Sequence, residues 1–395
     1  MHDGAVTRRC IFFVGGYDPK SAEAFFGRLA REFRRSEALW GADSRMTLAE
    51  GPGADIGTAT IAASGDGWSV DATFGFLVMD GIVLRDFSRP LGVRLLKYLA
   101  AFADFVASGA ALRMFAKNWR FGLYFLFPFA ALLLFACLGA ALGRFVALAG
   151  FPFAGPVGIV VGAVTFAGCL KWLGGRWPVN HLMDLWSFSH DYLRGRRADA
   201  DALIGRWAEA IVERVRNGDF DEVLLVGHST GGALILDVAA RCIALDADFS
   251  GRARHVALLT LGSTALKVGM HPAAERFRAG VQALVDDHRL EWVEVQCLTD
   301  AINFYKSDPV ADMRLRPRAA GAFPMVRTVR MKHMLADETY RRIKRNFFRV
   351  HYQYIYGNTK PYFYDFFMIC CGPMPLSTRM EKLRVGTLRP PETAP

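Results

Sequence analysis

The chain contains the sequence VLLVGHSTGGALIL at residues 223–236. Its first four residues are apolar and end at a glycine, a pattern typical of a short buried strand. A glycine-rich turn follows, and the apolar pattern then continues as a helix. Ser229 lies at the centre of this turn, between Gly227 and Gly231. A serine placed in this way is held at the tip of the strand, because the glycines beside it permit a bend that larger side chains would block.

This arrangement predicts that Ser229 is a nucleophile. The helix after it presents backbone N–H groups and the positive end of its dipole, and both stabilise a developing oxyanion. The Gly-x-Ser-x-Gly pattern alone arises often by chance, so the strand before it and the helix after it are the stronger evidence. His228 lies beside the serine in the same turn. We expect it to pack or to orient its neighbours, and not to be the general base.

On these residues the chain resembles the α/β-hydrolase family, especially its lipases and esterases. The resemblance implies an α/β fold with a mostly parallel sheet flanked by helices, over about residues 8–85 and 178–355. Strands and helices alternate along these stretches, as such a sheet requires. The resemblance also implies that the backbone N–H of Thr230 is one donor of an oxyanion hole.

The second oxyanion donor is expected at the end of the first strand. The apolar run Cys10–Val14 predicts a buried strand, and two glycines and Tyr17 follow it. In α/β-hydrolases a turn after such a strand supplies backbone N–H groups to the oxyanion. Gly16 and Tyr17 are therefore donor candidates. The alternative is a plain turn into a helix expected at about residues 21–35, in which the glycines serve only the backbone geometry.

The resemblance places the acid of a catalytic triad before its histidine, each at the carboxyl end of a strand. A strand is predicted at Glu291–Leu298 by its alternating pattern, and Asp300 follows it directly. Asp300 is the first candidate for the acid. Asp308, further along the same loop, is the alternative. Either aspartate could instead satisfy its own backbone in a turn.

Two histidines are candidates for the general base. His333 follows a strand predicted at Met325–Met331, but the charge of the adjacent Lys332 would weaken it as a base. His351 follows a charged helix predicted at residues 336–348 and lies in an aromatic-rich stretch. Such a stretch can line a dry pocket, where a buried carboxylate holds the imidazole in one tautomer. We favour His351 and keep His333 as the alternative.

Two long stretches of the chain carry no charge. Residues 121–143 are mostly Phe, Leu and Ala, and residues 145–170 contain a long Val, Gly, Ala and Phe run. A membrane-spanning helix needs about 20 apolar residues, and each stretch is long enough. Two prolines, at 152 and 156, lie near the start of the second stretch. The pair predicts a transmembrane helical hairpin with its tip near residues 150–156.

The charges around this hairpin predict its orientation. The short tip carries only Arg144, whereas five cations flank the outer ends: Arg113, Lys117, Arg120, Lys171 and Arg176. Positive residues near a span stay preferentially in the cytoplasm. Both ends of the hairpin, and the catalytic domain connected to them, are therefore expected on the cytoplasmic side of the membrane.

The composition agrees with a membrane-associated protein. The chain has 395 residues, 52% of them hydrophobic, and a formal net charge of +10. No basic-aromatic nucleic-acid module is present, and attraction to anionic lipid explains the positive charge more simply. The seven cysteines show no metal-ligand spacing and are expected to be free thiols in a reducing compartment. We expect neither a metal nor a cofactor.

These patterns divide the chain into four parts. Residues 1–115 and 178–372 are expected to form the hydrolase core, 116–177 the hairpin, and 373–395 a polar tail. The expected protein is a membrane-anchored serine hydrolase, acting on acyl or lipid esters beside a lipid bilayer. Two other functions fit the same patterns: a non-catalytic membrane protein that uses the fold as a scaffold, and a thioesterase or acyltransferase.

Overall fold

The computed structural model describes residues 5–49, 55–318 and 321–382. The chain divides into two compact units. One is made of Met1–Val83 and Arg197–Pro395, and the other is the inserted segment Leu84–Arg196. The inserted unit is longer than the hairpin expected at residues 116–177, because helices on both sides of the hairpin belong to it.

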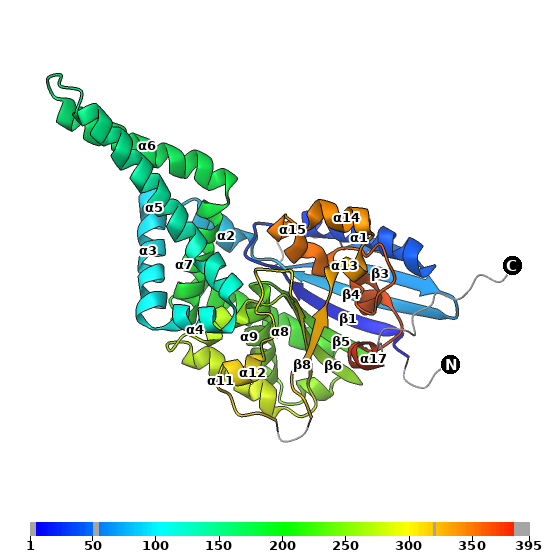
Figure 1. Ribbon diagram of the computed structural model, residues 1–395. Helices are drawn as coiled ribbons and strands as arrows, with labels where there is room; N and C mark the ends of the chain where they lie inside the picture. The colour runs from blue at the N-terminus through cyan, green and yellow to red at the C-terminus, as the bar shows by residue number, and fades with distance from the viewer. Residues whose placement is uncertain (1–4, 50–54, 319–320, 383–395) are drawn as a thin grey trace. The chain divides into compact units, whose positions relative to one another are not determined.

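The first unit is built on one mixed sheet of eight strands (Figure 1). The strands are β1 (Arg8–Val14), β2 (Asp43–Leu48), β3 (Ile56–Gly65), β4 (Trp68–Leu77), β5 (Glu222–His228), β6 (His255–Leu261), β7 (Glu291–Cys297) and β8 (Met325–Val329). Their order in the sheet is β2-β3-β4-β1-β5-β6-β7-β8. Strands β2, β3 and β4 pair antiparallel, and all other pairs are parallel. The predicted α/β class and the mostly parallel sheet are confirmed.

Helices cover both faces of this sheet (Figure 1). Helices α1 (Ala22–Trp40), α16 (Phe366–Cys371) and α17 (Leu376–Lys382) lie on one face. Helices α8 (Ala198–Arg216), α9 (Gly231–Leu245) and α11 (Glu275–Asp286) lie on the other. The remaining short helices of this unit are α10 (Ala265–Gly269), α12 (Pro309–Asp312), α13 (Met331–Met334), α14 (Asp337–Ile343) and α15 (Phe347–Tyr352). Helix α2 (Asp80–Phe87) contains the boundary between the units.

The core of the first unit is formed by the side chains that alternate along the strands. Ile11 and Phe13 of β1 point to the face covered by α1 and join one continuous apolar cluster there. The ring of Phe25, from α1, stacks on Phe13 at 5.0 Å and on Phe76 of β4 at 4.2 Å between centroids. Strand β1 is buried along its length except at Arg8, as expected for a central parallel strand.

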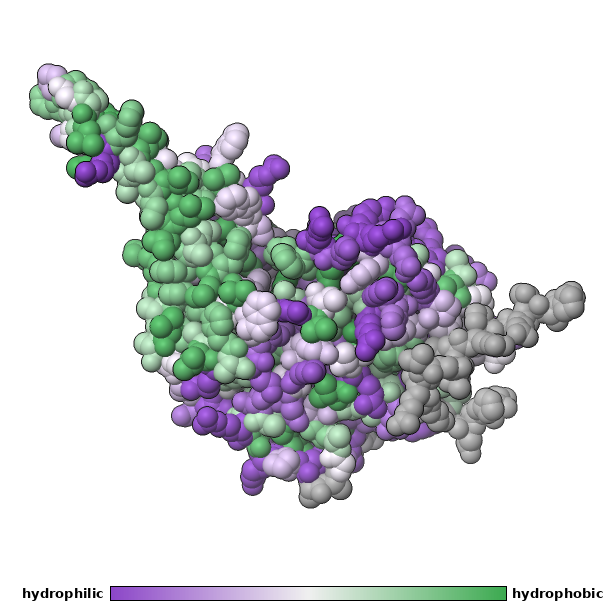
Figure 2. Space-filling view, viewed as in Figure 1, coloured by the Kyte–Doolittle hydropathy of each residue, from purple (hydrophilic) through white to green (hydrophobic). Residues whose placement is uncertain are grey.

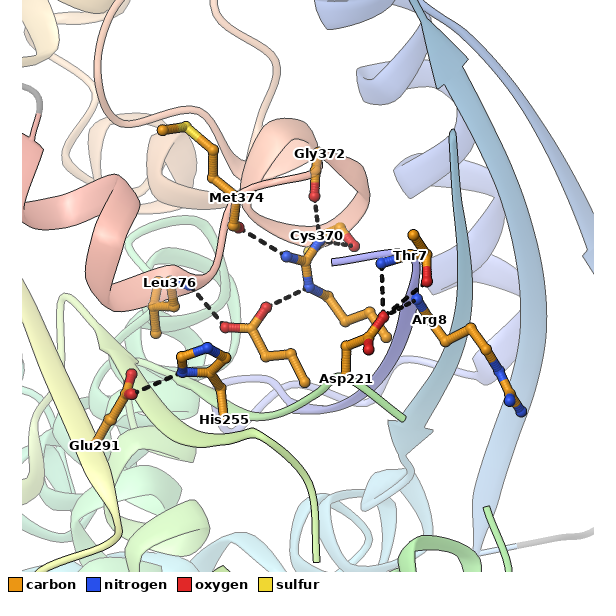
Figure 3. A network of polar contacts seen from close by, with 11 residues as sticks. Thr7, Arg8, Asp221, His255, Glu291, Cys370, Gly372, Met374 and Leu376 are labelled. Carbon is orange, nitrogen blue, oxygen red and sulfur yellow. Dashed lines mark hydrogen bonds and ion pairs between the residues drawn. The ribbon is translucent and has the colours of Figure 1, made fainter. Parts of the chain in front are cut away.

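A buried ion pair holds the C-terminal segment against the amino ends of the central strands. Nε of Arg9 on β1 lies 2.6 Å from the carboxylate of Glu222 on β5, and both side chains are fully buried. The Arg9 guanidinium also donates to backbone carbonyls of the C-terminal segment, and Figure 3 shows these carbonyls at Cys370, Gly372 and Met374. The other oxygen of Glu222 accepts the N–H of Leu376 at 2.7 Å.

This packing corrects the expectation of a polar tail from residue 373. Leu376, Arg379 and Met380 in α17 are all buried, so this helix is packed into the domain. The aromatic residues before them serve mainly the core, since Tyr354, Tyr364 and their neighbours belong to the apolar cluster. Residues 383–395 of the expected tail lie outside the described residues.

The inserted unit is entirely helical. Its helices are α3 (Leu91–Ala107), α4 (Ala110–Lys117), α5 (Trp119–Ala147), α6 (Ala154–Arg176) and α7 (Val179–Leu193). Helices α5 and α6 are long and apolar enough to cross a membrane, and Figure 2 shows a largely hydrophobic surface over them. Helices α3 and α4 together could form a third span, but a bend of 71° separates them.

Ion pairs join α3 to α7 inside this unit. Arg94 pairs with Asp184 at 2.5 Å, and Lys97 pairs with Asp191 at 2.6 Å. The bend between α3 and α4 occurs at Gly109, which has a positive φ of 72°. The helical segment that begins at Leu91 therefore ends at Ala107 and restarts at Ala110, because glycine readily adopts a conformation that interrupts a helix.

Four glycines let α5 and α6 approach closely. A Cβ added at Gly143 would lie 2.5 Å from the carbonyl oxygen of Gly158, and one added at Gly139 would lie 2.6 Å from that of Gly162. On each helix the two glycines are four residues apart, so they line one face. Small residues at this spacing allow membrane helices to pack backbone to backbone.

Candidate active site

Ser229 lies in a strained turn at the carboxyl end of β5, directly before α9. Its φ of 60° is in the left-handed region, which side chains other than glycine rarely adopt. Its backbone N–H donates to the carbonyl of Leu261 at 3.0 Å, and its own carbonyl accepts the N–H of Thr264 at 3.0 Å. The serine is partly exposed while His228 and Thr230 on either side are buried. The fold therefore maintains a strained backbone that presents one hydroxyl.

The glycines of this turn are required by close contacts. A Cβ at Gly227 would overlap the carbonyl of Gly231 and the side chain of Ile235 in α9. A Cβ at Gly231 would overlap the carbonyls of Val14 and Gly15 at the end of β1. The start of α9 can therefore lie against both β5 and β1 only because these two positions lack side chains.

The serine lies at the boundary between β1 and β5, where the order in which strands are added to the sheet reverses. After β1 the chain continues to β2, β3 and β4 on one side, and after β5 it continues to β6, β7 and β8 on the other. In open α/β sheets, ligands bind in the crevice that such a reversal leaves at the carboxyl ends of the strands. Ser229 and the turn after β1 both lie at this crevice.

Two of the predicted oxyanion donors, Gly16 and Thr230, lie beside the serine. A Cβ added at Gly16 would be 3.4 Å from Cβ and 3.5 Å from Oγ of Ser229, so this turn lies directly against the hydroxyl. Tyr17, next along the turn, is buried. Thr230 caps the N-terminus of α9, where backbone N–H groups have no intrahelical acceptor. Its hydroxyl accepts a hydrogen bond from Nζ of the buried Lys267 at 3.0 Å, which ties the turn to α10.

Asp300 and His351 form a buried hydrogen-bonded pair. Oδ2 of Asp300 lies 2.7 Å from Nδ1 of His351, and both side chains are almost fully buried. The other oxygen, Oδ1, accepts the N–H of Ile302 at 2.9 Å and so orients the carboxylate. A carboxylate accepts hydrogen bonds, so Nδ1 carries the proton and the lone pair is on Nε2.

The lone pair of His351 is available for proton transfer. Among the described residues its Nε2 is buried and has no hydrogen-bond partner, the hydroxyl of Ser229 included. Bonds between a nucleophile and its base are often loose until substrate is bound. The imidazole is thus held in one orientation, and its Nε2 lone pair is not engaged by any described residue.

His228 supports this histidine. Its Nε2–H donates to the backbone carbonyl of His351 at 2.9 Å, and the two ring centroids are 4.6 Å apart. Complete burial lowers the pKa of His228 well below its ordinary value, so the ring stays neutral. His228, which directly precedes the serine, therefore holds the segment that contains His351.

The alternative residues are placed differently. Asp308 caps α12, where Oδ1 accepts the N–H groups of Val310 and Ala311 at 2.9 and 3.1 Å. His333 lies exposed in α13, and the centroid of its ring is 6.1 Å from that of the Tyr362 ring. Across the described segments, neither makes a hydrogen bond to Ser229, Asp300 or His351. The structure therefore brings together Asp300 and His351, and not the alternative pair.

A pocket adjoins the serine on the side of α1. It is small, with a cavity volume of about 30 Å³. Its apolar lining is Phe13, Phe25, Leu29, Phe76, Leu77, Met79 and Ile355. Its backbone and polar lining is Gly15, Gly16, Asp18, Lys20, Arg28, His228 and Tyr352. Lys20 and Arg28 could not be recognised as pocket residues from the sequence, because nothing in their local pattern shows that α1 packs beside the turn at Ser229.

No group of three or more histidine, cysteine or acidic side chains could hold a metal ion within the described segments. The seven cysteines are all unpaired.

No protein-family model, curated protein or solved structure matches this chain. The roles of the site residues therefore rest on the geometry and chemistry of the chain itself.

Proposed function

We propose that this protein is a membrane-anchored serine hydrolase that cleaves acyl or lipid esters. One observation carries the proposal: the buried Asp300–His351 pair packs against His228, the residue directly before Ser229, and Ser229 itself is held with positive φ at the end of β5. A carboxylate that orients an imidazole, together with an activated serine, is the recurrent arrangement of serine hydrolases.

In the proposed reaction, Oγ of Ser229 forms a bond to the ester carbonyl carbon, and Nε2 of His351 takes its proton. Asp300 keeps Nδ1 protonated and stabilises the imidazolium. The N–H of Thr230 and those of Gly16 or Tyr17 stabilise the oxyanion. The ester C–O bond then breaks, and His351 gives the proton to the leaving alcohol. Water, activated by the same histidine, releases the acid from the serine.

The substrate class is suggested by the two membrane-length helices and the pocket. Helices α5 and α6 would anchor the chain in a bilayer, and the cations at their outer ends favour a cytoplasmic catalytic domain. The pocket beside the nucleophile turn is lined largely by apolar side chains, which suit an acyl chain. An ester of lipid character satisfies both features.

The proposal is tested by labelling the full chain, purified in detergent, with a fluorophosphonate that reacts with activated serines. We expect wild type to be labelled and Ser229→Ala to be unlabelled. The matched control is Ser64→Ala, an exposed serine of β3, which should label like wild type. If Ser229→Ala is labelled as strongly as wild type, or if wild type is not labelled at all, the protein is not a serine hydrolase of this kind.

A further inference from the structure

The pocket beside Ser229 contains two cations and one carboxylate. Asp18 and Lys20 come from the segment between β1 and α1, and Arg28 comes from α1. The same pocket reaches Gly16, which touches the serine. A ligand in this pocket can therefore contact the nucleophile turn and the charged groups together.

The positive charge of Lys20 is already balanced by a carboxylate. Its Nζ lies 2.5 Å from the carboxylate of Asp18 and donates to the hydroxyl of Tyr352 at 3.0 Å. That hydroxyl donates in turn to Asp18 at 2.8 Å, which closes a three-membered network. Asp18 is the only carboxylate among the residues that line the pocket, and it is fully engaged by Lys20 and Tyr352.

The positive charge of Arg28 is not paired with a carboxylate of any described residue. Its guanidinium donates to the hydroxyl of Tyr356 at 3.3 Å and lies 5.9 Å from the ring of Tyr352. Within the described residues it has no ion pair, although its side chain is partly buried. Most of its five N–H groups are therefore free to bind an anion, and burial among aromatic rings strengthens such a contact. Arg28 also lowers the pKa of Lys20, after the larger effect of burial, so the two cations lie close enough to interact.

We infer that Arg28 binds an anionic group of the ester substrate, such as a carboxylate, phosphate or sulfonate. The inference rests on the proposed hydrolase function and narrows its substrate to an amphipathic ester. The apolar part lies against Phe25, Phe76 and their neighbours, and the anionic group reaches the guanidinium. Arg28 is then a specificity-determining residue that takes no part in the chemical steps.

The experiment compares three chromogenic or spectroscopically followed esters. The first is the neutral p-nitrophenyl butyrate. The second, mono-p-nitrophenyl glutarate, carries a carboxylate on the acyl side, and the third, 4-sulfophenyl butyrate, carries a sulfonate on the leaving group. The full chain in detergent is measured as wild type, Arg28→Gln, Arg28→Lys and the control Arg31→Gln, an exposed arginine one turn further along α1.

We expect Arg28→Gln to lower kcat/KM roughly tenfold to hundredfold for at least one anionic ester, mainly through KM, because a charge-assisted contact is lost. Its kcat/KM for the neutral ester should stay within about twofold. Arg28→Lys should restore part of the loss, since it keeps the charge without the planar fork. Arg31→Gln should behave like wild type with every ester.

Two results would overturn this inference and leave the proposed function standing. One is that Arg28→Gln lowers the cleavage of neutral and anionic esters equally. The other is that the variant changes none of them. If no ester is cleaved in a Ser229-dependent manner, the proposed function fails, and the inference fails with it. The fluorophosphonate labelling distinguishes this last case from the first two.

Discussion

At the scale of single residues, the site depends on which atom of His351 carries the proton. Asp300 holds the proton on Nδ1, and this leaves the Nε2 lone pair for the proposed general base. Asp308 lies in the same loop but uses its carboxylate to cap a helix. The two aspartates therefore have different functions, although their sequence contexts made both of them candidates.

Replacing Asp300 by asparagine should lower kcat by about 10⁴-fold, because the amide favours the wrong imidazole tautomer. The measurement is steady-state hydrolysis of p-nitrophenyl butyrate by the full chain. Asp308→Asn is the matched control, since asparagine also caps helices well, and its kcat should equal that of wild type. Equal losses in the two variants would contradict the assignment of Asp300.

A second residue-scale prediction concerns Glu294, buried at the centre of β7. Burial raises its pKa to about 8, against an ordinary value of 4.5. The folded state therefore keeps a proton that the unfolded state loses, so the stability of the wild type falls as the pH rises from about 4.5 to 8. Its carboxyl accepts a hydrogen bond from Thr260, which a glutamine oxygen could also accept.

Glu294→Gln removes this titration and should be more stable than wild type at pH 8.5, with a much smaller difference at pH 5. For a domain of this size, each kcal/mol corresponds to about 2–4 °C in Tm. Thermal unfolding in detergent at the two pH values measures the difference. The control Glu213→Gln, exposed on α8, should show no such dependence on pH. A constant difference between Glu294→Gln and wild type across this range would refute the prediction.

At the scale of elements, apolar runs in the sequence predicted strands well, whereas the breaks within helical segments could not be predicted from the sequence. Strand β1 contains the whole run predicted at Cys10–Val14, because apolar residues fill that run from end to end. The helix predicted at residues 336–348 is instead two short helices, since the side chain of Asn346 caps the start of α15. A cap inside a charged helical pattern has little effect on periodicity, so the pattern alone could not show the break.

The contact between α5 and α6 gives the element-scale prediction. Gly158→Leu should force the two helices apart by several ångströms, because a side chain there meets the backbone of α5. Spin labels at Leu142→Cys and Ile159→Cys, both exposed, would report the distance after Cys137 and Cys169 are replaced by serine. Gly168→Leu is the control on the same helix, since nothing lies within 4 Å of the added Cβ. An unchanged distance in Gly158→Leu would show that the helices are not in backbone contact.

At the scale of the whole molecule, the sequence identified the α/β class, the two membrane-length helices and the position of the serine turn. Each of these is a local property of composition or spacing. The inserted unit extends beyond the predicted hairpin because ion pairs such as Arg94–Asp184 join residues about ninety positions apart. The pocket cations Lys20 and Arg28 likewise acquire their place only through tertiary packing. Local patterns contain no information on such contacts.

The flanking charges also predict the topology of the anchor. With both ends of the hairpin in the cytoplasm, the tip should face the opposite side of the membrane. A cysteine introduced at the exposed tip residue, Phe153→Cys, should react in intact cells with a membrane-impermeant maleimide. Arg34→Cys, exposed on α1, should react only after the membrane is opened. The reverse pattern would place the catalytic domain outside the cytoplasm.

The pairing of β1 with β5 has a consequence for biosynthesis. A ribosome makes β1 first, but its partner on one side, Glu222–His228, is translated only after the whole inserted unit. Until then β1 has only β4 beside it and an open edge on the other side, which is a state that invites mispairing. The ion pair of Arg9 with Glu222 and its bonds to the segment at 370–374 form later still. The two membrane-length helices α5 and α6 are therefore translated before the sheet can be completed, and the edge of β1 stays unpaired during this interval.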